Sequence, residues 1–190
     1  MIRAFVAIEI PGTVELGNLL DRLRKSGSQV SVPRAENVHV TMKFLGDVQE
    51  DRVGSIMGAI AEATSGFASF EAKIVGTGAF PGPRNPRVLW VGIEDGGAMG
   101  RIADAIDERI SALGFERERR AFTPHITIAR VKSQAGIDRG LSISREYEKV
   151  DFGTFSVSDV RLKKSTLTPS GPIYEDLGVI QLRARDTPRE

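Results

Sequence analysis

The two histidines of this chain occupy equivalent places in two similar halves, and this repetition constrains the fold more than any other feature. Residues 3–9 (RAFVAIE) resemble residues 87–94 (RVLWVGIE). His39 follows the first of these segments by 30 residues, and His125 follows the second by 31. Such a period predicts one supersecondary unit built twice.

Hydrophobic patterning gives both halves the same order of elements. Apolar residues at helical spacing predict helices at 16–23, 53–60 and 99–113, with a less regular helix at 135–147. Short β-like runs predict strands at 3–10, 38–45, 70–75, 88–93, 125–131, 155–162 and 174–182, the last reached through a turn at 168–172. The order is roughly β-α-β-α-β twice, with an appended hairpin. No Gly-rich phosphate loop follows a strand, which argues against a doubly wound parallel sheet.

We therefore expect an α+β fold with two pseudo-symmetric β-α-β-α-β lobes and helices on the outside. The Pro/Gly segment 80–86 marks the midpoint and is the expected crossover between lobes. The predicted organisation is one bilobal domain over residues 1–190, with a first repeat of about 1–80 and a second of about 87–190.

Composition excludes several classes of function. Hydrophobic residues make up 41% and charged residues 27%, as in a packed globular domain, and the net charge of +1 gives no bulk attraction for nucleic acid. The absence of cysteine excludes disulfides, thiolate zinc sites and a cysteine nucleophile. Arg3 and Glu9 interrupt the apolar run at the N-terminus, which is too short to span a membrane and does not resemble a signal peptide. We expect a cytoplasmic protein without a membrane partner.

Each histidine has a threonine two residues later, as His39 with Thr41 and His125 with Thr127. Residues i and i+2 of a strand share a face, so each pair projects together while the residue between them points into apolar packing. A pseudo-twofold axis would bring the two pairs face to face. Two imidazoles can act as general acid and general base, and two hydroxyls can donate hydrogen bonds to phosphate oxygens.

A two-histidine metal site is the sharper alternative to acid–base catalysis. It would need a third ligand, and neither motif contains another histidine, a cysteine or a carboxylate. We therefore expect no metal and no cofactor.

Four segments resemble a known family: the opening residues 3–8, His-Val-Thr-Met-Lys-Phe-Leu-Gly at 39–46, the Pro-Arg-Val-Leu-Trp region at 86–90, and Pro-His-Ile-Thr-Ile-Ala-Arg at 124–130. Together they are similar to the two-histidine phosphoesterase superfamily, and within it to the RNA 2′,3′-cyclic phosphodiesterases, historically described as 2′-5′ RNA ligases. The resemblance spans nearly the whole chain.

The resemblance implies mainly antiparallel sheets facing a central cleft, and metal-independent hydrolysis of an RNA 2′,3′-cyclic phosphate end to a 2′-phosphate. It assigns His39 as proton donor and His125 as proton acceptor, although a pseudo-symmetric site by itself permits either assignment. The expected ligands are RNA 3′ ends or cyclic nucleotides, and the expected state is a monomer.

Five further residues in or near these motifs have expected positions of their own. Arg130 is a candidate phosphate contact beside Thr127, yet strict alternation places it on the face opposite His125. Lys43 shares the face of His39 by alternation and is expected to be solvated. Phe5, Phe44 and Trp90 are expected in the core.

The mixed-charge run at 116–120 is typical of a solvated loop close to the second motif. Two other functions are compatible with the same residues. One is 2′-5′ RNA ligation, in which a 5′-hydroxyl replaces water. The other is a non-catalytic module that binds RNA or nucleotides.

Overall fold

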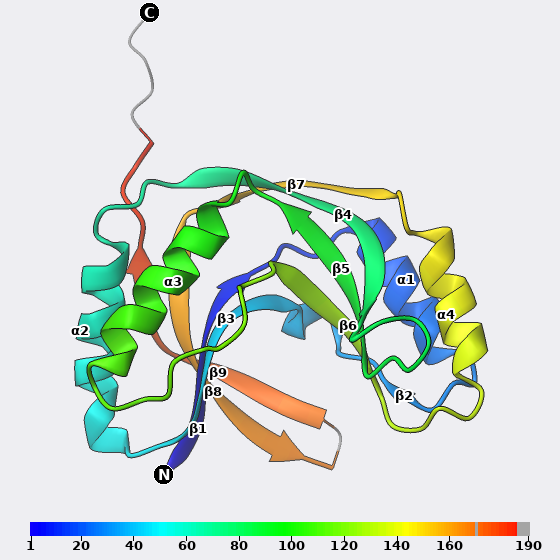
Figure 1. Ribbon diagram of the computed structural model, residues 1–190, viewed down its shortest axis with the longest axis horizontal. Coiled ribbons are helices and arrows are strands. Elements are labelled where there is room, and N and C mark those ends of the chain that lie inside the picture. Colours follow the sequence, from blue (N-terminus) through cyan, green and yellow to red (C-terminus); the bar gives the residue numbers. More distant parts are fainter. Residues whose placement is uncertain (170, 186–190) are drawn as a thin grey trace, which may run out of the picture.

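The computed structural model describes residues 1–169 and 171–185, and its centre is a curled antiparallel sheet covered by helices on its outer side (Figure 1). The strands are β1 (Ile2–Glu9), β2 (Val30–Ser31), β3 (His39–Val48), β4 (Phe70–Phe80), β5 (Val88–Glu94), β6 (His125–Val131), β7 (Asp151–Val157), β8 (Asp159–Thr168) and β9 (Gly171–Gln181). The helices are α1 (Val14–Arg24), α2 (Val53–Thr64), α3 (Ala98–Ser111) and α4 (Ile137–Glu146), with single 3-10 turns at Ala35–Asn37 and Glu50–Arg52.

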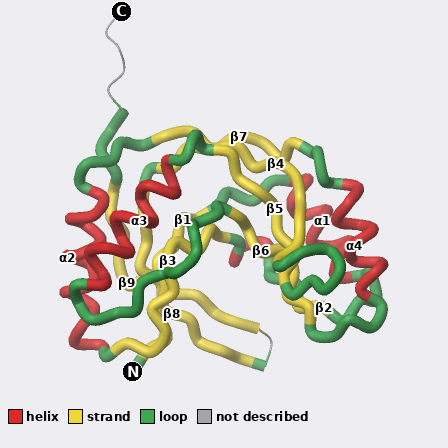
Figure 2. Tube along the Cα trace, viewed as in Figure 1, coloured by secondary structure: helices red, strands yellow, loops and turns green. Residues whose placement is uncertain are grey.

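The sheet divides into two halves, which we call lobe A and lobe B. The order of strands is β7-β4-β5-β6-β3-β1-β8-β9, with β2 added beside β6, and every ladder is antiparallel. Lobe A contains β3, β1, β8 and β9 with helices α2 and α3, whereas lobe B contains β7, β4, β5, β6 and β2 with α1 and α4. Figure 2 shows the two helix pairs at opposite ends of the sheet.

Apolar residues on the inner sides of the helices hold each pair against the sheet. In α1 these are Leu16, Leu19, Leu20 and Leu23, each at most 1% exposed, and the Thr13 side chain caps the helix by accepting from the backbone N–H of Leu16 at 3.2 Å. The helices therefore occupy the convex side, which leaves the opposite side of the sheet for polar residues.

The lobes exchange strands. β4 follows α2 of lobe A along the chain but pairs with β5 in lobe B, whereas β8 pairs with β1 in lobe A. Segment 80–86 was expected to cross between the lobes, but it closes a hairpin between the adjacent strands β4 and β5. The chain crosses between the lobes earlier, in the connection from α2 to β4. The prediction failed because a Pro/Gly-rich segment makes a tight reversal as readily as a long connection.

The predicted α+β fold with two pseudo-symmetric lobes is confirmed, and the lobes are continuous through one pair of residues, Val40 and Ile126. The weakly periodic segment 135–147 does form a helix. The strand predicted at 155–162 is wrong, because β7 ends at Val157, Ser158 interrupts the pairing, and β8 continues in the other lobe. Part of the turn predicted at 168–172 lies outside the described residues, at position 170.

Candidate active site

The two motifs meet where the two lobes join. Val40 and Ile126, each the residue between a histidine and its threonine, are antiparallel partners and are fully buried. In this register His39 lies across from Thr127, and the first motif's threonine lies across from His125. Both pairs project from the face opposite the two buried residues. The sheet register therefore assembles two imidazoles and two hydroxyls on the inner side of the curl.

The first imidazole is fixed by two hydrogen bonds. His39 Nδ1–H donates to the backbone carbonyl oxygen of Asn37 at 2.8 Å, and Nε2 lies 3.1 Å from Thr41 Oγ1. A carbonyl oxygen can only accept, so the Nδ1 proton is retained in both charge states and Nε2 is the nitrogen that exchanges protons.

The second imidazole is held in the same way. His125 Nδ1–H donates to the carbonyl oxygen of Thr123 at 2.7 Å, again two residues before the histidine. Within residues 1–169 and 171–185, no protein hydrogen bond occupies Nε2 of His125. Both rings thus carry the proton on Nδ1 and lie on the same face of the sheet, and in this tautomer Nε2 is the nitrogen that can transfer a proton.

Both histidines have a pKa below the ordinary value of 6.5. Burial is the main cause for each, because it disfavours the charged imidazolium. The carbonyl bonds to Nδ1 oppose this shift, whereas the positive charge of Arg130 adds to it at both rings. The site is therefore uncharged at both imidazoles near neutral pH, with a fixed cation beside them.

Equivalent β-bulges follow the two motifs. Val6 pairs with Lys43 and Ala7 with Thr41, which leaves Met42 as the extra residue in β3. In β6, pairing of Leu89 with Ala129 and of Trp90 with Thr127 leaves Ile128 as the extra residue. Each bulge lies three residues after the histidine. A bulge reverses the alternation of side chains beyond it.

The bulge in β6 corrects the expected position of Arg130. Strict alternation puts this side chain opposite His125, but the extra residue Ile128 returns it to the face of His125 and Thr127. Its charge lowers the pKa of both His39 and His125, in agreement with a position between the two motifs.

The bulge in β3 has the opposite consequence for Lys43. This lysine was expected to be solvated on the face of His39, but it turns to the helix side and is only 3% exposed. Its Nζ donates to Asp107 of α3 at 2.6 Å and to the Glu116 carbonyl oxygen at 2.8 Å. The ion pair and the hydrogen bond offset the free-energy cost of removing the lysine charge from water, so Lys43 has a structural role. It also fixes the start of the loop at 116–120, which was predicted as a loop and is one.

Phe44 is the position in β3 that corresponds to Arg130 in β6, and the prediction that it belongs to the core is wrong. Its side chain is 46% exposed, because the same bulge turns it toward the inner face. Its ring stacks on Phe5 at 5.9 Å between centroids, and the Arg3 guanidinium lies 5.5 Å from its centroid. Phe5 is buried as predicted, and Trp90 is half-buried.

Aromatic rings surround the histidines unequally. His39 contacts Phe5 and Tyr174, with centroids at 5.0 and 5.3 Å, whereas His125 contacts Phe80 at 5.0 Å. Tyr174 lies in β9. The sequence predicted this strand but did not place Tyr174 beside a histidine, because β9 has no counterpart in the repeat that contains the two motifs.

A cluster of charged side chains lies beside His39 in lobe A. Lys163 of β8 is 6% exposed and donates to Glu9 at 2.6 Å and to Asp176. Arg161 lies 2.8 Å from carboxylate oxygens of Glu9, Asp159 and Asp176. Lys163 lowers the pKa of His39 and Glu9 raises it. Sequence patterning missed this cluster because its members lie on three separate strands.

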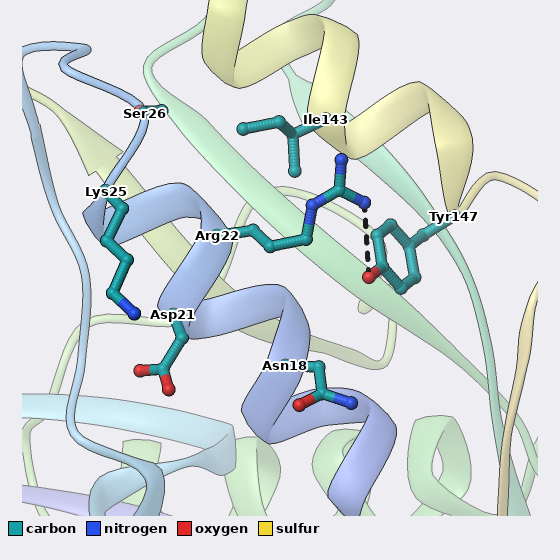
Figure 3. A pocket seen from close by; sticks show the side chains of 7 residues that line it. All are labelled: Asn18, Asp21, Arg22, Lys25, Ser26, Ile143 and Tyr147. Atoms are coloured by element: carbon teal, nitrogen blue, oxygen red, sulfur yellow. Dashed lines mark hydrogen bonds between the residues drawn. The ribbon is translucent and has the colours of Figure 1, made fainter.

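A separate hollow of about 600 Å³ lies between α1 and α4 on the helix side of lobe B (Figure 3). Its lining includes Arg22, which pairs with Glu146 at 2.7 Å and lies 3.4 Å from the Tyr147 hydroxyl. No residue of either motif lines it. The site formed by the two motifs therefore lies elsewhere in the molecule.

Two kinds of feature are absent from residues 1–169 and 171–185. No group of three or more histidine, cysteine or carboxylate side chains is arranged to hold a metal ion. None of the described helices has the length and apolar character needed to cross a bilayer.

Comparison with known proteins identifies relatives along almost the entire chain. The RNA 2′,3′-cyclic phosphodiesterase of Methanothermobacter thermautotrophicus is 36% identical over 183 residues, covering 95% of this chain and 99% of that protein. The RNA 2′,3′-cyclic phosphodiesterase of Archaeoglobus fulgidus is 38% identical over 183 residues, covering 95% and 100%.

Solved structures share the fold. The protein TT0787 of Thermus thermophilus superposes with a TM-score of 0.77 at 26% identity, covering 96% of this chain and 99% of that one. LigT of E. coli, solved in complex with 3′-AMP, superposes with a TM-score of 0.73 at 21% identity, covering 95% and 98%. The family model described as the 2′-5′ RNA ligase superfamily matches residues 13–166. This chain belongs to the 2′-5′ RNA ligase superfamily.

Proposed function

We propose that this protein hydrolyses RNA 2′,3′-cyclic phosphate ends to 2′-phosphates by general acid–base catalysis, without a metal. The observation that carries the proposal is the Val40–Ile126 pairing, which sets two His-x-Thr motifs across from each other with both Nε2 atoms presented to one space. Relatives 36% and 38% identical over almost the whole chain are RNA 2′,3′-cyclic phosphodiesterases, which supports the same reaction.

In the proposed reaction His125 Nε2 takes a proton from water, and the water oxygen forms a bond to phosphorus. The bond from phosphorus to the ribose O3′ breaks, and His39 Nε2–H protonates the departing O3′. The product carries a 2′-phosphate and a free 3′-hydroxyl. Thr41, Thr127 and Arg130 donate to the non-bridging oxygens, whose negative charge grows in the transition state.

The unequal surroundings of the histidines support this assignment of roles. The leaving oxygen belongs to the nucleoside, and the half of the site around His39 offers aromatic surface from Phe44 and Tyr174. The phosphate is an anion, and Arg130 stands in β6 beside the second motif. Binding the anion raises the pKa of His39, which supplies the protonated acid that the free site lacks near neutral pH.

The test is incubation of the purified protein in EDTA with a short RNA ending in a 2′,3′-cyclic phosphate, followed by mapping of the product end. A 2′-phosphate that the double variant His39→Ala/His125→Ala does not produce is the expected result. A 3′-phosphate product, or activity that EDTA abolishes and zinc or manganese restores, would contradict the proposal.

Ligation is the second candidate, because the matched family is described as 2′-5′ RNA ligases. The same acid–base pair would let a 5′-hydroxyl attack phosphorus in place of water. Adding a 5′-hydroxyl RNA to the assay measures the share of each product. We expect hydrolysis to dominate, since water is in large excess and no second-strand site was evident in the sequence.

The proposed ligands are RNA 3′ ends and small cyclic nucleotides, and the proposed working state is a cytoplasmic monomer with the two repeats 1–80 and 87–190 in one domain. Sedimentation of the active protein would test whether it is a monomer. Its activity on nucleoside 2′,3′-cyclic phosphates would test whether small cyclic nucleotides are substrates.

A further inference from the structure

We propose that Asn37 is a positioning residue that ties the imidazole of His39 to the β8–β9 hairpin. This inference rests on the proposed function for its catalytic consequence. It concerns a side chain outside both His-x-Thr motifs.

Asn37 makes two contacts in opposite directions. Its backbone carbonyl oxygen accepts from His39 Nδ1–H at 2.8 Å, and its side-chain Nδ2 donates to the carbonyl oxygen of Pro172 at 3.1 Å. Pro172 lies near the start of β9, 135 residues further along the chain. One residue therefore connects the tip of the hairpin to the group that orients the imidazole.

The same hairpin contacts His39 a second time. Tyr174 lies two residues after Pro172, and its ring meets the imidazole edge-on with centroids 5.3 Å apart. Tyr174 also packs on Phe5 at 5.1 Å, and Phe5 packs on His39 at 5.0 Å. β9 thus acts on both ends of the imidazole, through the Asn37 carbonyl at Nδ1 and through a ring at its side.

The second lobe shows why the first needs this tether. His125 is preceded by Thr123 and Pro124, and a proline restricts both its own φ and the conformation of the residue before it. The carbonyl that holds His125 is therefore oriented by local chain stiffness. Val38 occupies the corresponding position before His39 and provides no such restriction.

The side chain of Asn37 is not required to close the turn in which it lies. The 3-10 turn Ala35–Asn37 is closed by backbone bonds, from Asn37 N–H to the Arg34 carbonyl at 3.0 Å and from Val38 N–H to the Ala35 carbonyl at 3.4 Å. The amide of Asn37 is left to bond the hairpin. Its removal should therefore release the turn from the hairpin, so that the Asn37 carbonyl shifts together with the turn, without dissolving the turn itself.

The two histidines of the chain make the inference measurable by NMR. In Asn37→Ala we expect the ¹⁵N signals of the His39 ring to move toward a mixture of Nδ1–H and Nε2–H tautomers, while those of His125 stay in place. In the proposed reaction kcat should fall by up to about 100-fold with KM little changed, as for a small misplacement of a catalytic group. Asn37→Ser keeps a polar side chain that is too short to reach Pro172. It should show the same changes as the alanine variant, and it takes the place of that variant if Asn37→Ala folds poorly.

The matched control is Glu175→Gln. Glu175 directly follows Tyr174 in β9 but pairs with Lys164 of β8 at 3.2 Å, and it is exposed. It should leave the His39 signals and kcat unchanged. Tyr174→Phe should restore most of the activity that Tyr174→Ala loses, because the ring makes the contact.

Unchanged His39 signals together with unchanged kcat in both Asn37 variants would overturn the inference, as would equal movement of both histidines. The NMR arm needs no substrate. If the wild-type protein fails to hydrolyse the cyclic phosphate, the proposed function fails, and the ring signals still decide whether Asn37 holds His39.

Discussion

The strands β3 and β6 deliver the same groups to the site by the same geometry, yet they surround them differently. Each presents a histidine, a threonine and a bulge three residues after the histidine. Five residues after the histidine, however, β3 has Phe44 and β6 has Arg130. In the proposed reaction, the backbone repeat supplies a symmetric pair of proton-transfer groups, and the side chains beyond the bulges distinguish the side that binds the nucleoside from the side that binds the phosphate.

The two lobes also differ in how they hold the imidazole. Lobe B uses Pro124, adjacent in the chain, whereas lobe A uses Asn37 and Tyr174 through a distant hairpin. The orientation of His125 depends on two adjacent residues of the chain, whereas the orientation of His39 depends on β9 being folded in place. Lobe A should therefore be the more sensitive of the two to changes away from its motif.

Removal of either histidine should have the largest effect. His39→Ala and His125→Ala should each lower the rate by roughly 10²–10⁴-fold, because each proton transfer contributes about that much. Single-turnover hydrolysis of the cyclic phosphate measures the loss, and circular dichroism checks the fold. If one variant kept near wild-type activity, the two lobes would not be catalytic equals.

The threonines should come next. Thr41→Ala or Thr127→Ala should cost about 2.7–4 kcal/mol of transition-state stabilisation, if each hydroxyl acts like an oxyanion donor. The kcat of the two variants should fall similarly, with Thr→Ser recovering part of the loss. Thr41 also meets His39 Nε2 at 3.1 Å, so a larger effect there than at Thr127 would show that this contact orients the ring.

Arg130 and Phe44 test the asymmetry directly. Arg130→Ala should lower kcat by a factor that corresponds to about 1.5–3 kcal/mol of lost transition-state stabilisation, the range for a hydrogen bond to a charged group. Phe44→Ala should mainly raise KM, by a factor that corresponds to about 1–3 kcal/mol of lost base–aromatic stacking. Phe44→Trp should not weaken binding. Equal kcat effects from both variants would remove the distinction between the two sides.

The pH dependence of stability should be the smallest effect. Both histidines have a pKa below 6.5 in the folded chain because burial disfavours their charged forms. The unfolded chain then binds more protons just below pH 6.5, so the free energy of unfolding falls as the pH drops through the folded pKa values. Urea unfolding at pH 7.5 and at pH 5.5 measures this slope.

The double variant His39→Gln/His125→Gln should flatten that slope, and the two single variants divide it between the lobes. A wild-type protein no more sensitive than the double variant would show that the histidines titrate as they do in the unfolded chain.

The sequence by itself determined the repeat, the α+β class and the identity of the four motif residues, because strand alternation and helical period are local properties. It also indicated the family, which the comparisons confirm. It failed wherever a neighbouring strand decides the outcome. The segment 155–162 reads as one strand, but β7 and β8 pair in different lobes.

Only the tertiary structure decided which way Lys43, Phe44 and Arg130 face. A period of two predicts all three on the wrong side, because a bulge exists only relative to the partner strand. The partner's register leaves Met42 and Ile128 unpaired, and the side chains that directly follow them reverse. The charged cluster around Lys163 and the tether at Asn37 depend in the same way on β8 pairing with β1 and on β9 pairing with β8, which no local pattern encodes.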